Sequence, residues 1–355
     1  MRYSKLIAAV LLMLFVSGCS LFGGGKPGVG EEVPQATAPL DEEGYGKVEL
    51  LVAVSGGELE APAGVAVSSE GDVYVSDDAR QVVLRFPQGD LKADPISIGS
   101  EGSSLGQFIH PRDLALDDSG NLYVLDDGNS RVQFIPADGG TSRQFGRRDD
   151  FVSYFSLQDG YDEPLSALAV DQEGNVYVGV SGANYDITSN AIIKFSPQGE
   201  RLWEVRSMLE GDIDILPFTW PDAMVVDDDG TLYITHGANG VGKIFVLPQK
   251  DGQPDKEGAY QFGLIGKGPG ELMHTPGGIA LTQDDDVLVA DTYNNRLQLF
   301  TKDGTLKAMY RLKGSPTAEF DQPTAVSVAP DGSVYVVDKG NKRVLQLRLL
   351  PPSEG

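Results

Sequence analysis

One short pattern recurs six times along the chain, and this repeat limits the fold more than any other feature. Each copy begins at a proline, continues into an apolar stretch, turns at polar or acidic residues, and ends in a further strand-like stretch. Successive copies start 47 to 57 residues apart. A fixed period of about 40–55 residues with strand-like segments indicates the blades of a β-propeller. The copies begin at Pro62, Pro111, Pro164, Pro221, Pro276 and Pro323.

The segments inside each copy behave as strands and not as helices. Apolar residues alternate or form β-branched runs, as in 64–67, 122–125 and 131–134. Between the first two strands lies a turn such as 117–121, whose Gly, Asn and Asp tolerate positive φ in tight hairpins. A fourth strand follows in five copies. We predict these fourth strands at 96–98, 142–145, 202–205, 260–262 and 306–310.

The sixth copy ends after its third strand, and the segment 48–54 is a strand without a repeat of its own. We expect this segment to pair as the outermost strand of the last blade and so to close the ring. Closure removes the exposed sheet edge that would favour aggregation. The predicted fold class is therefore all-β: a six-bladed β-propeller of four-stranded antiparallel blades, closed by the N-terminal strand.

Segments 124–132, 289–297 and 336–344 resemble NHL repeats, and the resemblance extends over the chain from Gly46 onward. It implies a six-bladed propeller but indicates little about activity, because this scaffold serves enzymes and binding proteins alike. Each of the three segments contains an Asp and an Arg five residues apart. We expect these charges to pair and to hold their loop in place. The pairs are Asp126 and Arg131, Asp291 and Arg296, and Asp338 and Arg343.

The N-terminal residues predict export and lipid attachment. Arg2 and Lys5 precede an apolar run, 6–16, that is too short to span a bilayer stably. Val-Ser-Gly-Cys at the end of this run resembles the bacterial lipobox, which implies a lipid on Cys19, the single cysteine of the chain. An ordinary cleaved signal with an incidental cysteine is the alternative.

The chain therefore divides into four predicted parts. Residues 1–18 form a lipoprotein signal peptide, and 19–45 form the lipidated cysteine and a flexible Gly, Pro and acidic tether. The propeller covers 46–350, and 351–355 are a tail. We expect a monomeric propeller in the cell envelope, at the outer membrane of a Gram-negative organism or otherwise at the outer face of the cytoplasmic membrane. A formal net charge of −24 excludes nucleic acid as a favoured partner and leaves the lipid on Cys19 as the membrane contact.

Copies three and four lose the Asp–Arg pair and have altered loops, which predicts a binding face for a protein or a glycan. The loop after Val178 is expanded as far as Ala191, and the connections 147–163 and 207–220 on the same face are long. The alternative is that the loop aromatics pack only against one another. The predicted face consists of Tyr154, Phe155, Tyr161, Tyr185, Asp186, Phe218, Trp220, Asp222 and His236.

The sequence contains no motif for a nucleophile or a phosphate-binding loop. His110, His236 and His274 fall at different offsets in the repeat, unlike the metal-binding histidines of amidating lyases, which the architecture resembles. Asp113 and Asp222 near the expected channel mouth could contribute to a calcium site of the lactonase type, but no spacing identifies one. We predict no catalytic residue, metal or cofactor, and a lipid-anchored binding scaffold. The alternative is a metal-dependent hydrolase or lyase, lactonase-like or amidating-lyase-like, at the channel mouth.

Overall fold

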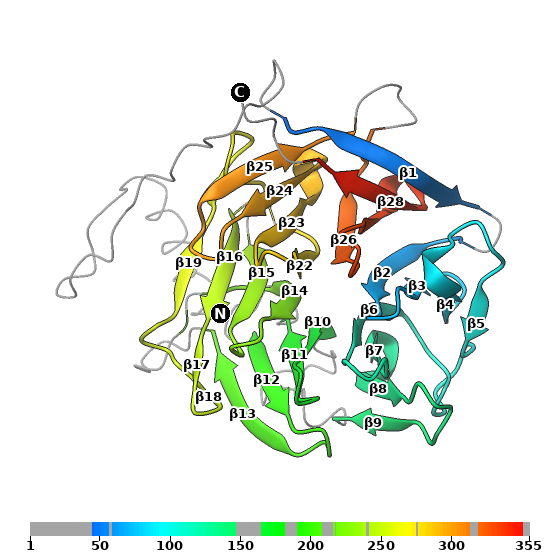
Figure 1. Cartoon of the computed structure of the whole chain (residues 1–355). Coiled ribbons are helices and arrows are strands. Elements are labelled where there is room, and N and C mark those ends of the chain that lie inside the picture. Colours follow the sequence, from blue (N-terminus) through cyan, green and yellow to red (C-terminus); the bar gives the residue numbers. More distant parts are fainter. Residues whose placement is uncertain are drawn as a thin grey trace, which may run out of the picture. The chain divides into compact units, whose positions relative to one another are not determined.

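The described residues form a ring of six four-stranded antiparallel sheets, as the repeat predicts (Figure 1). All of them belong to the compact unit Val33–Gly355. Among them, no helix has the length and apolarity needed to cross a membrane. The computed structural model describes residues 45–56, 59–146, 165–181, 190–207, 216, 218–238, 241–274, 276–312 and 319–350.

Five blades consist of strands that follow one another along the chain. In blade order their bounds are β2 (Pro62–Val67), β3 (Val73–Asp77), β4 (Val82–Phe86) and β5 (Ile96–Ile98); β6 (Pro111–Leu116), β7 (Leu122–Asp126), β8 (Arg131–Ile135) and β9 (Arg143–Phe145); β10 (Leu165–Val170), β11 (Val176–Val180), β12 (Ala191–Phe195) and β13 (Arg201–Arg206); β14 (Pro221–Val226), β15 (Leu232–Ala238), β16 (Val241–Leu247) and β19 (Tyr260–Phe262); β22 (Ile279–Leu281), β23 (Val287–Asp291), β24 (Arg296–Phe300) and β25 (Leu306–Tyr310).

The sixth blade joins the two ends of the propeller, which confirms the predicted closure. It contains β26 (Pro323–Val328), β27 (Val334–Asp338) and β28 (Arg343–Leu349), and its outermost strand is β1 (Val48–Ser55). Strand β1 runs antiparallel along β28 from the Val48–Leu349 pair to the Ser55–Arg343 pair, and Figure 1 shows the blue strand beside the red one. The ring therefore has no open blade.

All five predicted fourth strands are present, each with bounds within one residue of the prediction. Two small additions were not predicted. A short hairpin, β17 (Gln249–Lys250) with β18 (Gln253–Pro254), extends blade four, and β20 (Leu264–Ile265) pairs in parallel with β21 (Glu271–Leu272). Each of these strands is only two residues long, which is too short to give a periodic apolar signal.

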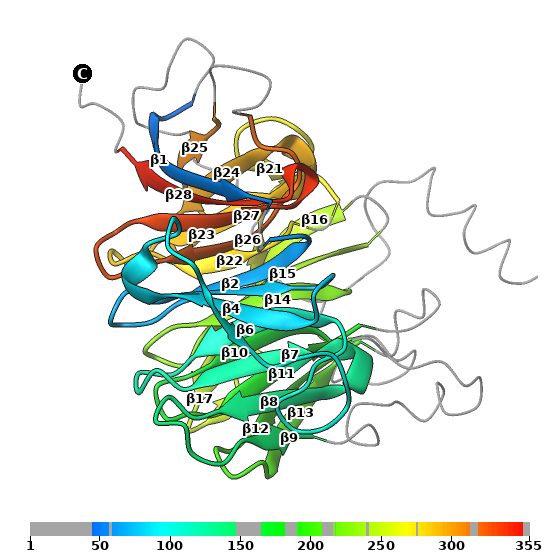
Figure 2. The same cartoon turned by 90° about the vertical axis from the view of Figure 1, so that its right-hand side faces the viewer.

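The core lies between the blades, because neighbouring sheets stack face to face around the ring. Tyr74 and Val83 of blade one pack with Leu122 and Val124 of blade two, and Figure 2 shows these sheets from the side. Every residue of the second strands β3, β7, β11, β23 and β27 is buried. A strand covered on both sides reads as a continuous apolar run, which is how these strands read in the sequence.

Among the described residues, side chains at the end of five second strands, or just beyond them, also bind the next blade. A Ser or Thr hydroxyl donates in four of these links, and an Asp carboxylate accepts in the fifth. Each link satisfies a main-chain group near the start of the next inner strand, so it fixes neighbouring inner strands relative to one another. The links are Ser76 to Arg112 O, Asp127 from Leu165 N, Ser181 to Pro221 O, Thr235 to Gly277 O and Thr292 to Pro323 O.

Candidate binding site at the channel mouth

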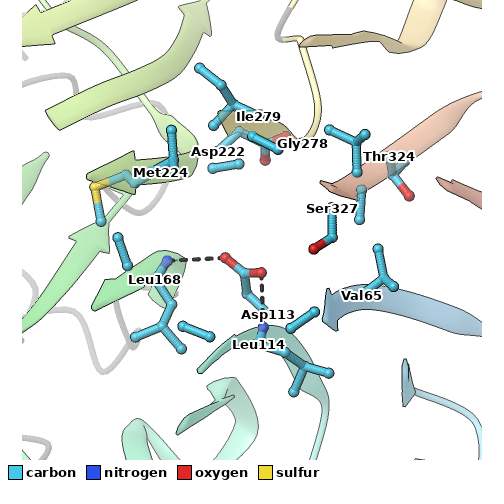
Figure 3. A pocket seen from close by; sticks show the side chains of 18 of the residues that line it. Val65, Asp113, Leu114, Leu168, Asp222, Met224, Gly278, Ile279, Thr324 and Ser327 are labelled. Carbon is cyan, nitrogen blue, oxygen red and sulfur yellow. Dashed lines mark hydrogen bonds between the residues drawn. The ribbon is translucent and has the colours of Figure 1, made fainter. Parts of the chain in front are cut away.

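The inner strands of all six blades surround a central cavity of about 520 Å³. Apolar side chains such as Val65, Leu168, Met224 and Ile279 line its walls together with polar groups (Figure 3). The charged lining residues lie in the loops before or after the strands, or at the start of an inner strand. They are Arg112, Asp113, Asp222 and Lys339.

These charged residues mark one face of the propeller, which we call the loop face. It is formed by the connections between second and third strands, such as Asp127–Asn129 and Thr292–Asn294, and by the residues that lead into each inner strand. The opposite, hairpin face carries the tight turns between first and second strands. Because every inner strand starts at the loop face, the residues after the repeat prolines form the channel mouth there.

At the mouth, blades two and four are joined by an ion pair. The guanidinium of Arg112 lies 3.5 Å from the carboxylate of Asp222, with side chains 44% and 33% exposed. Asp113 lies next to this pair and points into the cavity (Figure 3). Its carboxylate accepts hydrogen bonds from Leu114 N at 2.9 Å and from Leu168 N of blade three at 3.0 Å.

Burial raises the pKa of Asp113 to about 7, from an ordinary value near 3.8. The Leu114 and Leu168 amides and the Arg112 charge lower this pKa in part, while the charge of Asp222 raises it further. Burial also raises the pKa of Asp222, against the opposing charges of Arg112 and Lys339. The mouth therefore contains a carboxyl group that is partly protonated near neutral pH.

The Asp–Arg pairs of the sequence are present and structural. Arg296 Nε donates to Asp291 at 2.8 Å, and the other nitrogens of Arg296 donate to main-chain oxygens of the connection entering the same blade, including Gly268 O and Glu271 O. Gln298 Nε2 also donates to Asp291 and to Glu271 O. The pair thus holds this entering connection as well as its own loop.

Blades two and six repeat this arrangement, with Asp126 and Arg131 at 2.8 Å and Asp338 and Arg343 at 2.6 Å. A glutamine completes the cluster in blades two and five and was missed from the sequence, whereas blade six has Leu345 at that place. Gln133 occupies in blade two the place of Gln298 in blade five. The recurrence of Gln two residues after the Arg was the available signal.

Blade four replaces the motif Asp with a buried histidine. His236 pairs with Pro221 in the sheet as Asp126 pairs with Pro111, and its Nδ1 accepts from Thr219 N at 3.2 Å. Burial lowers the pKa of His236 to about 4, and the charge of Lys243 contributes to this. The ring is therefore neutral at pH 7. Its buried Nε2 has no hydrogen-bond partner in the described part of the chain.

The structure corrects two residues of the predicted binding face. Phe218 is fully buried, with its ring 5.6 Å from that of Phe245, and His236 is only 4% exposed. Both pack inside blade four, so neither presents its side chain to a partner. Trp220 has a φ of 37° and leads into the inner strand β14, while Asp222 lines the channel mouth. Outside the described residues lie Cys19, Tyr154, Phe155, Tyr161, Tyr185 and Asp186.

The other two histidines have separate neighbours. His110 Nδ1 lies 2.8 Å from Asp78 Oδ1, and the ring of His274 lies 4.8 Å from that of Tyr293. Within the described ranges, no group of three or more His, Cys, Asp or Glu side chains could hold a metal ion. Sequence reasoning missed Tyr293, which is 52% exposed beside the mouth, and Ser166, a buried residue of the cavity wall.

Comparison with known proteins identifies the repeats. The NHL repeat model matches residues 108–133, 273–300 and 320–347, which fall in blades two, five and six. NHL repeat-containing protein 3 of Mus musculus is 32% identical over 143 residues, which cover 39% of this chain and 38% of that protein. Its Homo sapiens counterpart is 28% identical over 181 residues, 50% of each chain. The chain thus spans half or less of the length of these curated relatives.

Solved structures share the architecture at low identity. A streptogramin B lyase superposes with a TM-score of 0.54 at 12% identity, over 86% of this chain and 98% of the lyase. A virginiamycin B lyase from Staphylococcus aureus gives 0.53 at 11% identity, over 86% and 100% of the two chains. Similarity at this level reports the fold and not the activity. The chain is therefore a six-bladed β-propeller that carries NHL repeats in at least three of its blades.

Proposed function

We propose that the protein is a lipid-anchored, non-catalytic scaffold of the cell envelope that binds a protein through its loop face, with a glycan as the alternative ligand. The main support is the collection of accessible polar and aromatic groups around the channel mouth. Tyr293 is 52% exposed there, and Arg112, Asp222 and Lys339 line the opening. An aromatic side chain beside charged groups at a concave opening is typical of recognition sites.

Buried ion pairs hold parts of the loop face in place, which lowers the conformational entropy that is lost when a partner binds. In blades two, five and six, a buried Asp–Arg pair fixes the connections that form this face. A preorganised surface loses less conformational entropy when a partner docks. The long connections 147–163 and 182–189 lie outside the described residues, and we propose from their sequence that they extend the same face.

Photo-crosslinking tests the binding face. A photoreactive amino acid at Tyr293 should give a discrete adduct in cells, whereas the same group at Asp118, an exposed turn residue of the hairpin face, should give none. Deleting 182–189, which leaves strands β11 and β12 intact, and replacing Trp220 with Ala should abolish the adduct at Tyr293 while leaving the unfolding midpoint nearly unchanged. Equal adducts from both faces, or an adduct insensitive to this deletion, would reject the proposal.

The anchor is proposed from Cys19 and the residues before it. The variant Cys19→Ser should move the protein from the membrane fraction to the soluble fraction and abolish labelling by an alkyne fatty acid. Labelling that persists in this variant would mean that the lipid is attached to another residue, and it would reject Cys19 as the anchor.

A metal-dependent hydrolase or lyase at the channel mouth is the second candidate, favoured by the partly protonated Asp113 beside Asp222. Elemental analysis of the purified protein separates the two functions. Stoichiometric zinc or calcium that is lost in Asp222→Asn would support the enzyme. Metal well below one equivalent would support the scaffold.

A further inference from the structure

Asp113 breaks the pattern of a ring of small residues at the channel mouth. The residue that immediately precedes Leu114 of blade two, or its counterpart in the register of the other sheets, is small in every blade but one. Glycine and alanine leave the channel open at this level, and an aspartate places a carboxylate there. Because the other blades fold without this carboxylate, the repeat itself does not require it. The six residues are Gly64, Asp113, Ala167, Ala223, Gly278 and Ala325.

The carboxylate of Asp113 is partly buried and has no paired cation. It takes part in no ion pair within the described part of the chain, and two backbone amides are its hydrogen-bond donors. The two cations of the mouth act mainly on Asp222, since Arg112 lies 3.5 Å from it and Lys339 also lowers its pKa. A buried carboxylate is stable when a cation neutralises it.

Ser166 gives a second, independent indication. It lies in blade three at the position that corresponds to Arg112 in blade two, is 3% exposed and lines the same cavity. Its buried hydroxyl has no hydrogen-bond partner among the described residues. An unsatisfied buried hydroxyl destabilises the folded state, so it points to a polar group that occupies the cavity in the bound state.

The surrounding wall defines the rest of the ligand. Leu114, Leu168, Met224 and Ile279 supply apolar surface around the Asp113 carboxylate (Figure 3). A cavity of about 520 Å³ accommodates a chain of several methylene groups. The net charge of −24 attracts cations from solution toward this opening.

We propose that the channel mouth binds a primary ammonium group on an aliphatic stem, held by the Asp113 carboxylate and the Ser166 hydroxyl. The stem lies against the apolar wall. This inference deepens the proposed function and rests on it in one respect, since a lysine side chain of the partner protein would supply such a group. A free aliphatic amine has the same chemistry.

Titration calorimetry with n-hexylammonium tests the site. Asp113→Asn should weaken binding by about 10–100-fold, because a charge-assisted hydrogen bond is lost, and Ser166→Ala by about 3–10-fold. Asp118→Asn, which removes the same charge at an exposed turn of the hairpin face, should change the affinity less than about 2-fold. n-Hexanol should not compete. Circular dichroism checks that each variant is folded.

A second arm identifies the source of the ammonium group. If a capped tripeptide with a central lysine binds and depends on Asp113, a partner's lysine is the ligand; if only the free amine binds, the ligand is a small molecule. Absence of amine binding, or equal binding by the Asp113→Asn variant, overturns the proposal. Cross-linking from Tyr293 is independent of this titration, so an adduct without amine binding would reject only this inference, and amine binding without an adduct would reject only the protein partner.

Discussion

Arg296 Nε lies 2.8 Å from Asp291 Oδ2, and the two side chains are 1% and 0% exposed. A buried ion pair has little net value by itself, because both charges must be desolvated. Its importance here is geometric, since the guanidinium also binds three main-chain oxygens of the connection entering blade five. Removal of one partner therefore leaves both a buried charge and unsatisfied carbonyl groups.

We expect Arg296→Met to lower the free energy of unfolding by about 3–5 kcal/mol, the range for breaking a buried pair. Arg348→Met is the matched control. Arg348 pairs with Glu49 at 2.9 Å, but the side chains are 56% and 49% exposed, so the loss should stay below about 1 kcal/mol. Urea denaturation measures both variants. Equal losses of stability would mean that the buried pair of Arg296 and Asp291 does not hold the connection entering blade five.

The links between blades predict a smaller effect. Thr235→Val keeps the shape of the side chain but removes the hydroxyl that donates to Gly277 O and accepts from Ala223 N. We expect a loss of about 1–3 kcal/mol from the two unsatisfied main-chain groups. Thr231→Val in the same blade, at a partly exposed turn position, should change stability by less than about 0.5 kcal/mol. A similar loss of stability in both variants would show that the link between blades is not its cause.

Ring closure by β1 gives a test with a control one residue away. Val54 packs against the core cluster that contains Val337 and Val344, whereas Ala53 is exposed. Val54→Asp should cost about 2–3 kcal/mol and increase light scattering, because a loosened β1 uncovers the edge of β28. Ala53→Asp should be nearly neutral in urea denaturation. A larger loss of stability in Ala53→Asp than in Val54→Asp would indicate that the opposite face of β1 packs against the core.

The sequence predicted the ring because strand periodicity and the repeat both depend on local patterns. The unpaired segment 48–54 and the missing fourth strand of the last copy together determined closure. The chemistry of the channel mouth was harder to predict from the sequence. Asp113 and Asp222 were candidate ligands, but the raised pKa of Asp113 arises from burial among residues of other blades, which no local pattern encodes.

Two residues of the predicted binding face are buried, for a physical reason. Phe218 and His236 occur in altered loops, which suggested exposure, yet both fill the interior of blade four. For an aromatic residue in a polar loop, the sequence does not show whether the side chain is buried in the core or exposed to solvent. His236 could have been recognised by its position, since it occupies the place of the motif Asp in the aligned copy.

Asp113 predicts a pH dependence of stability. Its pKa is about 7 in the folded protein and near 3.8 in the unfolded chain. The folded state therefore binds more protons, so this contribution to stability is present below about pH 4 and is lost as the pH rises through about 7. Relative to wild type, Asp113→Asn should gain on the order of 3–4 kcal/mol between pH 4 and 8. Parallel profiles from urea denaturation would show that Asp113 titrates normally.

His236 predicts the opposite slope over nearly the same range. Its pKa is about 4 when folded and near 6.5 when unfolded, so here the unfolded chain binds more protons. This contribution is full above about pH 6.5 and is lost as the pH falls toward 4. His236→Asn keeps an acceptor for Thr219 N, and relative to wild type it should gain about 3 kcal/mol between pH 7 and 4.

The two contributions oppose each other between about pH 4 and 6.5, so they should nearly cancel in the wild-type protein. Each single variant then reveals the slope of the remaining group: stability rises with pH in Asp113→Asn and falls with pH in His236→Asn, both relative to the double variant. The two sites lie in different blades and share no hydrogen-bond partner among the described residues, so their effects should add. A double variant whose profile departs from that sum would show that channel mouth and blade four are coupled.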